Sequence, residues 1–277
     1  MAKRKTQKSS DEDSKFIYGM NQLKNNSLIT EDQMLFFDIN VSKIKLTPGQ
    51  KTLSKHIKTK EIVFCEGLAG TGKTYVSCAL AIDLLKKFPE KYKKIVLIKS
   101  VTTLPEEEIG FLKGTMEEKM EPFMYSFMTN FEKLIGKAAV LKLKSEGLIE
   151  VRPIAYLRGS NIDNTITLID EAQNISKKNI RTILSRLGKD SKMIFLGDRN
   201  QVDMKKAHES SLTYMFKHFS DFEEIGFIEM TDADESRNPL IPKIEKRFSE
   251  LEEHKVMTKV KKEKEIDIEK EIIQNGS

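Results

Sequence analysis

The octapeptide GLAGTGKT, residues 67–74, constrains the fold of this chain more than any other stretch. It matches the pattern G-x-x-x-x-G-K-[ST] with a glycine, a glycine, a lysine and a threonine at the specified positions. In such a loop the backbone N–H groups surround phosphates, the lysine adds a point charge, and the threonine hydroxyl suits Mg²⁺. We therefore predict a nucleotide site formed by Gly67, Leu68, Ala69, Gly70, Thr71, Gly72, Lys73 and Thr74.

The residues on either side of the loop support this prediction. The apolar, β-branched run at 61–65 predicts a strand before the loop, and the apolar spacing at 75–88 predicts a helix after it. The loop would then lie at a helix N-terminus, where the helix dipole favours anions. A glycine-rich turn without a ligand is the alternative interpretation, and the strand and helix argue against it.

Length and composition limit the class of protein. A chain of 277 residues holds one large α/β domain, or a domain of about 200 residues with tails. With 39% hydrophobic and 32% charged residues, and no apolar run long enough for a membrane helix, we expect a soluble protein that does not bind membranes. The N-terminus lacks the apolar core of a secretory signal, and Cys65 and Cys78 look like core residues, so we expect a reducing, cytoplasmic location.

Charge patterning predicts the domain boundaries. Residues 1–20 are lysine-rich and then acidic, with almost nothing to bury, and predict a disordered tail. Residues 249–277 are mostly lysine and glutamate with a few isoleucines, and predict a charged, marginally helical tail. We expect a single domain over 21–248 with its core at 44–248. A net charge of +5 permits an anionic partner without requiring one.

A pair of acidic residues follows a predicted buried strand at 165–169. This strand delivers Asp170 and Glu171 at its carboxyl end. In a nucleoside triphosphatase one such carboxylate holds Mg²⁺, and the adjacent one orients and deprotonates the attacking water. Adjacent acids are usually just solvated, but the strand and the upstream phosphate loop favour a catalytic pair. We assign Asp170, with Thr74, to the metal and Glu171 to the water.

The rest of the chain continues the alternation of strands and helices. A helix is predicted from the N-cap Ser176 to Gly188, and an apolar strand at 192 onward ends in GDRNQVD. Gln201 in that segment is a candidate for contacting the attacking water or the γ-phosphate. Arg237 is a candidate charge for the transition state, with an ordinary salt bridge as the alternative. The predicted fold class is α/β, with a largely parallel sheet flanked by helices on both faces.

The motifs in their order resemble one family. GLAGTGKT, EEEIGFLKGTMEEKMEPFM, YLRG, LIDEAQN, GDRNQVD and ESRNPL are similar, in order and spacing, to segments of the PhoH-like ATPases, including those carried by bacteriophages. The resemblance covers about residues 44–248 and implies a RecA-like P-loop core, related to one motor domain of superfamily 1 helicases. It implies that ATP and Mg²⁺ are the cofactors, and that Gln201 acts as the γ-phosphate sensor of a GDxxQ motif.

The resemblance also suggests a residue that recognises the base, and at one position the chain departs from the family pattern. In superfamily 1 helicases a glutamine in a segment similar to that of Gln50 contacts the adenine edge, although an exposed helix glutamine is an equally good interpretation here. The family often has Arg-Pro or Lys-Pro after the second strand, where this chain has Lys99-Ser100. That difference puts a nucleic-acid role for this loop in doubt. If the chain is phage-encoded, its location would be the cytoplasm of the bacterial host.

Three functional hypotheses remain open at this level. The first is an ATPase that couples hydrolysis to the remodelling of single-stranded RNA or DNA, as a homo-oligomer because one motor domain cannot grip and step alone; a hexameric ring would give Arg237 a target across the interface. The second is a nucleotide-switched protein-binding module without unwinding activity. The third, a small-molecule kinase, is disfavoured because the DEAQ and GDxxQ segments suit water activation.

Overall fold

The computed structural model of the chain describes residues 44–100, 116–157, 161–204 and 210–235, and the helical pairs 240–241, 243–244, 247–248 and 250–251. The predicted tail at 1–20 lies outside the described residues, as does the tail at 249–277 except for residues 250 and 251, which are helical. The boundaries of the predicted domain at 21 and 248 therefore stay predictions.

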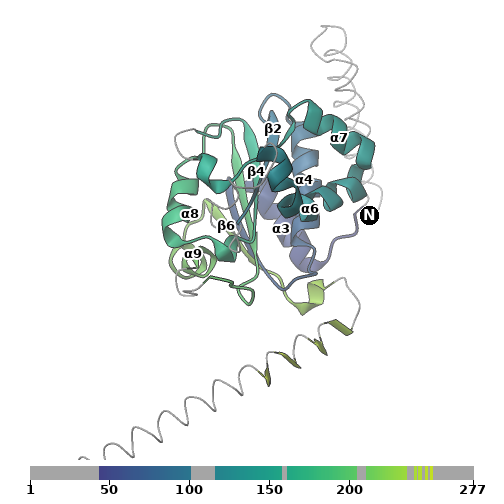
Figure 1. Ribbon diagram of the computed structural model, residues 1–277. Coiled ribbons are helices and arrows are strands. Elements are labelled where there is room, and N and C mark those ends of the chain that lie inside the picture. Colours follow the sequence, from purple (N-terminus) through teal and green to yellow (C-terminus); the bar gives the residue numbers. More distant parts are fainter. Residues whose placement is uncertain are drawn as a thin grey trace, which may run out of the picture.

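A six-stranded parallel sheet forms the centre of the fold (Figure 1). Its strands follow the order β3-β2-β4-β5-β1-β6, and each neighbouring pair is parallel. This arrangement confirms the predicted α/β class. The strands are β1 (Ile62–Glu66), β2 (Lys94–Lys99), β3 (Ile149–Val151), β4 (Thr165–Asp170), β5 (Lys192–Gly197) and β6 (Ile225–Glu229).

Helices cover both faces of the sheet, as expected for a parallel sheet that is buried on two sides (Figure 1). Alternate residues of each strand enter different cores: Val63 and Cys65 of β1 pack into one, and Phe64 packs into the other, stacked on Phe195 at 4.5 Å. One face carries α3 (Pro48–Thr59), α4 (Lys73–Lys87), α6 (Met116–Ile135) and α7 (Lys137–Ser145); the other carries α8 (Lys177–Leu184) and α9 (Ser211–Phe219).

The helix predicted after Ser176 begins as expected and ends early. The Ser176 hydroxyl accepts a hydrogen bond from Asn179 N at 3.2 Å and so caps α8. The helix ends at Leu184 instead of continuing to Gly188. The following residues form tighter turns, because Gly188 N donates to Ile162 O at 3.1 Å and ties this segment to the chain before β4.

The carboxyl ends of the parallel strands meet at one edge of the sheet. Gly67 follows β1, Asp170 ends β4, and Asp198 follows β5, which lies between β1 and β4. Two short 3₁₀ helices also belong to this part of the fold, η3 (Ala172–Asn174) after β4 and η5 (Asp232–Asp234) after β6. Chemistry-bearing side chains that are far apart in sequence therefore converge at this edge.

Candidate active site

A cleft of about 670 Å³ opens at the carboxyl edge of the sheet. The residues that line it come from the phosphate loop and the start of α4, the end of β4, the segment after β5, the start of α3 with residues 44–45 before it, and α6. It thus brings together five of the sequence-predicted residues that lie outside or at the end of the loop: Gln50, Thr74, Asp170, Glu171 and Gln201. Arg237 lies outside the described residues.

The phosphate loop turns sharply into α4. Gly70 and Gly72 have φ angles of 99° and 79°, which L-residues with side chains rarely adopt. A Cβ on Gly72 would also come within 2.7 Å of Gln50 Nε2. The left-handed backbone therefore favours glycine at position 72, and a side chain there would also displace the end of Gln50.

Lys73 is buried beneath the loop. Its ammonium donates to the carbonyl oxygens of Gly67 at 2.5 Å and Leu68 at 2.8 Å. Burial lowers the pKa of Lys73 below its ordinary value, against the opposing influence of nearby acidic groups. A bound phosphate would give this desolvated ammonium an anionic partner in place of neutral carbonyls, so the lysine is suited to phosphate binding.

Gln50 is buried, so the interpretation of it as an exposed helix residue is wrong. Its Nε2 donates to Thr71 O in the loop at 3.0 Å, and its Oε1 accepts from Thr47 N at 3.2 Å. These partners fix the orientation of the amide, because Thr47 N can only donate and Thr71 O can only accept. Gln50 braces the loop, and among the described residues one N–H of its amide group has no acceptor.

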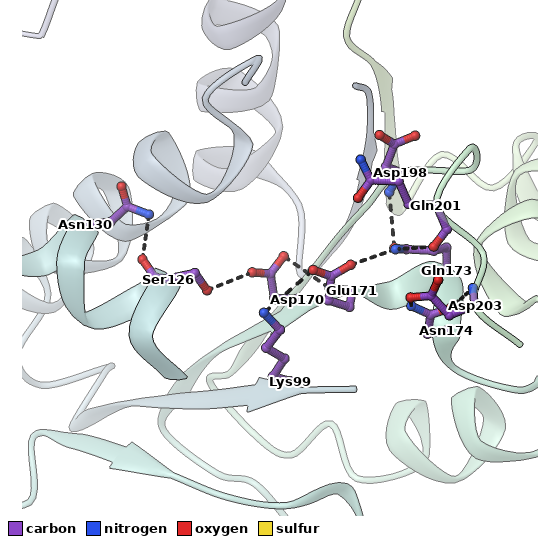
Figure 2. A network of polar contacts seen from close by, with 10 residues as sticks. All are labelled: Lys99, Ser126, Asn130, Asp170, Glu171, Gln173, Asn174, Asp198, Gln201 and Asp203. Carbon is purple, nitrogen blue, oxygen red and sulfur yellow. Dashed lines mark hydrogen bonds and ion pairs between the residues drawn. The ribbon is translucent and has the colours of Figure 1, made fainter. Parts of the chain in front are cut away.

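Asp170 and Glu171 occupy different environments. The Asp170 side chain is buried, with Oδ2 accepting from Ser126 Oγ at 3.3 Å and Oδ1 accepting from Glu171 N at 3.1 Å (Figure 2). Burial raises the pKa of Asp170, and the neighbouring Glu171 adds to the increase. A divalent cation would favour the ionised form of this carboxylate, so the donor set fits Mg²⁺, which prefers carboxylate and hydroxyl oxygens.

Glu171 has a strained backbone and defined partners. It adopts a left-handed conformation with φ 55° and ψ 40°, which costs on the order of 1 kcal/mol for a residue with a side chain. Its Oε2 accepts from Gln173 Nε2 at 2.7 Å, and its Oε1 lies 3.6 Å from Lys99 Nζ at the end of β2 (Figure 2). The carboxylate is therefore held over the cleft by a neutral donor and a cation.

Gln173 connects the end of β4 to the segment after β5. This side chain is fully buried; besides Glu171, its Nε2 donates to Gln201 O at 3.0 Å, and its Oε1 accepts from Asp198 N at 3.1 Å. Asp198 Oδ2 in turn accepts from Ala69 N in the phosphate loop at 3.2 Å. One network of hydrogen bonds thus joins the loop, the acidic pair and the Gln201 segment.

Sequence reasoning missed several members of this site. Gln173 and Asp198 stand within the quoted motifs DEAQN and GDRNQVD, so their places beside Glu171 and Gln201 could have suggested them. Arg199 pairs with Glu66 at the end of β1, and its guanidinium also lies 3.4 Å from Glu229. No local pattern indicates that pairing, because Glu66 and Arg199 are 133 residues apart.

The fold and the cleft define the class of protein: the chain has the fold of a P-loop nucleoside triphosphatase. More specifically, it belongs to the family described as PhoH-like protein, which it matches over residues 43–249, as the resemblance of its motifs predicted. It is 35% identical over 198 residues to the PhoH-like protein of Bacillus subtilis, covering 72% of this chain and 61% of that one. It is 30% identical over 188 residues to protein PhoH of Escherichia coli K12, covering 67% and 52%.

The chain therefore spans about 60% or less of the length of these bacterial relatives. The phage-borne form of the family stays a prediction for this chain. Among solved structures, the large terminase of a thermophilic bacteriophage matches with a TM-score of 0.43 and 10% identity, over 74% of this chain and 50% of that one. The Pif1 helicase of Candida albicans matches with a TM-score of 0.35 and 16% identity, over 68% and 40%. These distant likenesses concern the fold and carry no argument about activity.

No helix within the described ranges is long and apolar enough to cross a bilayer.

Proposed function

We propose that this protein binds ATP with Mg²⁺ and hydrolyses it. The observation that carries the proposal is the convergence of Lys73, Asp170 and Glu171 on one cleft at the carboxyl edge of the sheet. The loop residues Gly67–Thr74 would hold the phosphates, and Thr74 and Asp170 would hold the metal. Bound there, Mg²⁺ would neutralise charge that develops on the phosphate oxygens.

Glu171 is the proposed general base. It would orient a water molecule toward the γ-phosphorus and accept its proton as the bond to the β-phosphate oxygen breaks, giving ADP and phosphate. Lys99 and Gln173 support this role because they hold the carboxylate from two sides. Gln201 would contact the water or the γ-phosphate, Gln50 would face the base, and Arg237 would stabilise the transition state in cis or in a neighbouring subunit.

We further propose that hydrolysis is coupled to binding or remodelling of single-stranded RNA or DNA by a homo-oligomer. One domain of this kind offers one nucleotide-dependent grip, and stepping along a strand needs two, the second of which another copy of the domain would supply. A hexameric ring is one candidate assembly. A nucleotide-switched protein-binding module is the alternative, in which ATP orders a surface and no strand is moved.

ATPase rates with and without single-stranded RNA or DNA test the proposal. Wild-type protein is compared with Glu171→Gln and with Glu224→Gln, an exposed carboxylate before β6 that serves as the matched control. We expect Glu171→Gln to lower kcat by about 10² to 10⁴, the usual contribution of a general base, while nucleotide binding persists. Wild-type turnover in the Glu171→Gln variant would show that Glu171 is not the general base.

The nucleic-acid part of the proposal has its own outcome. Stimulation of the ATPase by oligonucleotide supports coupling. A slow, unstimulated ATPase whose oligomeric state changes with ATP, measured by sedimentation, would favour the protein-binding module instead. The cytoplasmic location and the domain limits at 21–248 belong to the same set of proposals.

A further inference from the structure

The helices α8 and α9 lie side by side on one face of the sheet (Figure 1). Together they present a basic surface. Neither helix contains an aspartate or a glutamate. Their cationic residues are exposed, and one partly exposed tyrosine lies among them. We call this surface the α8–α9 face; it consists of Lys177, Lys178, Arg181, Tyr214, Lys217 and His218.

Aromatic rings lie between the charges of the α8–α9 face. The Lys177 ammonium sits 5.1 Å from the centre of the Tyr214 ring, across the junction of the two helices. The Tyr214 ring lies 4.7 Å from the His218 ring, one helical turn further along α9. Cations alternating with rings on which bases can stack are typical of surfaces that bind single-stranded nucleic acid.

Two charges of this face oppose the stability of the helix that carries them. Lys177 and Lys178 are the first two residues of α8, next to the positive end of the helix dipole. Across the described residues, no acidic side chain forms an ion pair with Lys177, Lys178 or Arg181. A bound anionic partner would offset the repulsion from the helix dipole and would give these cations the ion pairs that they lack.

The α8–α9 face is tied directly to the segment that carries the proposed base. Ser211 at the start of α9 donates from its backbone N to Ile175 O at 2.8 Å and from its hydroxyl to Ala172 O at 3.2 Å. Ser176 and Ser210 pair as an isolated β-bridge. Both helices therefore begin at η3, which contains Gln173, the hydrogen-bond partner of Glu171.

We propose that the α8–α9 face binds the phosphate backbone of single-stranded nucleic acid and transmits this binding to Glu171 through η3. This inference rests on the proposed coupling of ATP hydrolysis to nucleic acid, and adds the surface on which the strand lies. The lysines and the arginine contact phosphates, and Tyr214 stacks on a base. Contacts to phosphates and to any base face give little preference for sequence.

The test replaces charge on this face and, as a control, on the opposite face of the sheet. Lys177→Gln/Lys178→Gln/Arg181→Gln is compared with Lys137→Gln/Lys142→Gln/Lys144→Gln on α7, which removes the same number of cations. Full-length proteins are titrated into fluorescein-labelled oligo(U) and oligo(dT), and binding is followed by anisotropy between low and high salt. Thermal unfolding and basal ATPase, which should not change, show that each variant is folded.

Three lost phosphate contacts should reduce the slope of log K against log salt by about 2, since each contact on a single strand contributes about 0.7. Affinity at about 0.1 M salt should then fall by about 100-fold for the α8 variant, and nucleic-acid stimulation of the ATPase should disappear. The α7 variant should lose much less affinity and should keep most of the stimulation. A Tyr214→Leu variant should bind about tenfold more weakly with an unchanged slope.

Three results would overturn the inference in distinguishable ways. If wild-type protein binds the probes and both triple variants lose the same affinity, the strand lies elsewhere, and the proposed coupling survives. If wild-type protein binds neither probe under any condition, the coupling and the α8–α9 face both fail. Binding of wild-type protein to phosphatidylserine vesicles but not to the probes would assign the face to a different anionic partner.

Discussion

The Nε2 atom of Gln173 lies 2.7 Å from Oε2 of Glu171, and this buried amide is the centre of the polar network at the cleft (Figure 2). Because its oxygen is committed to Asp198 N, the amide cannot rotate without losing a hydrogen bond at both ends. The position of Glu171 therefore depends on the position of the segment after β5. Movement of that segment would change the orientation of the proposed base.

Replacing Gln173 by leucine should lower turnover without removing nucleotide binding. Leucine fills a similar volume but removes the donor to Glu171 and the acceptor for Asp198 N. Loss of this orientation should cost about 10- to 100-fold in kcat, part of what a positioned base contributes, with KM within about threefold. Steady-state kinetics measure the split between the two constants. A folded Gln173→Leu protein with wild-type kcat would show that Gln173 does not position Glu171.

Lys73 should be required for stabilisation by nucleotide. A ligand at about 100 times its Kd stabilises a protein by about 2.7 kcal/mol, so ATP or ADP should raise the Tm of the wild-type protein measurably. Lys73→Met should abolish this increase, while its free energy of unfolding without nucleotide stays within about 1 kcal/mol of wild type, because a desolvated charge is removed. Lys87→Met, on the exposed side of the same helix, is the control. An undiminished shift in Lys73→Met would contradict the phosphate role.

The sequence indicates the central part of this fold because its elements have local signatures. The loop glycines, the buried strand before Asp170 and the N-cap Ser176 each predict their own structure from adjacent residues. The helix α7 has no such signature: it is short and lysine-rich, and buries only Val140 and Leu143. Its position comes from packing against α6 and β3, which local patterns do not contain.

The candidate site likewise contains residues that local motifs predict and contacts that only the tertiary structure shows. The residue types that perform phosphate chemistry stand in motifs and could be predicted. The long-range contacts around them could not, because they join segments that are distant in sequence: Gln50 contacts Thr71, and Arg199 contacts Glu66. The burial of Gln50 follows from the close approach of α3 to the loop at Gly72, which needs tertiary structure to become visible.

Glu66 should make stability depend on pH near neutrality. Burial raises its pKa to about 7, although Arg199 opposes the increase, and Oε2 has no hydrogen-bond partner among the described residues. Between its unfolded pKa of about 4.3 and 7, the folded state binds more protons than the unfolded state. The contribution of Glu66 to stability therefore falls as pH rises through this window.

Glu66→Gln should remove this dependence. Relative to wild type, the variant should be similar in stability at pH 4 and more stable at pH 8, by up to about 3 kcal/mol. Urea unfolding at a series of pH values measures the difference. Glu229→Gln, whose side chain is 62% exposed and which also faces Arg199, should show no comparable trend. A constant difference between wild type and Glu66→Gln across this range would contradict the assignment.

Asp234 should stabilise the fold and also the position of Gln50, which braces the phosphate loop. Its carboxylate accepts from Thr47 Oγ1 at 2.5 Å, Gly49 N at 2.9 Å and Thr231 N at 3.1 Å, and so holds the start of α3 against η5. Burial alone would raise its pKa, but these hydrogen bonds outweigh burial and lower the pKa below the ordinary value. The stabilisation is therefore present above the unfolded pKa of about 3.9 and is lost as pH falls through the lower folded pKa.

Asp234→Ala should reduce the free energy of unfolding by about 2 to 4 kcal/mol at pH 7, because three partly buried hydrogen bonds, from Thr47 Oγ1, Gly49 N and Thr231 N, lose their acceptor. Asp232→Ala, an exposed carboxylate in the same 3₁₀ helix, should change it by less than about 0.5 kcal/mol. The difference between the two variants should shrink below about pH 4, as the wild-type carboxyl is protonated. Since Thr47 N also holds Gln50, Asp234→Ala should raise KM for ATP even at temperatures where the protein remains folded. An unchanged KM would show that Gln50 braces the loop independently of Asp234.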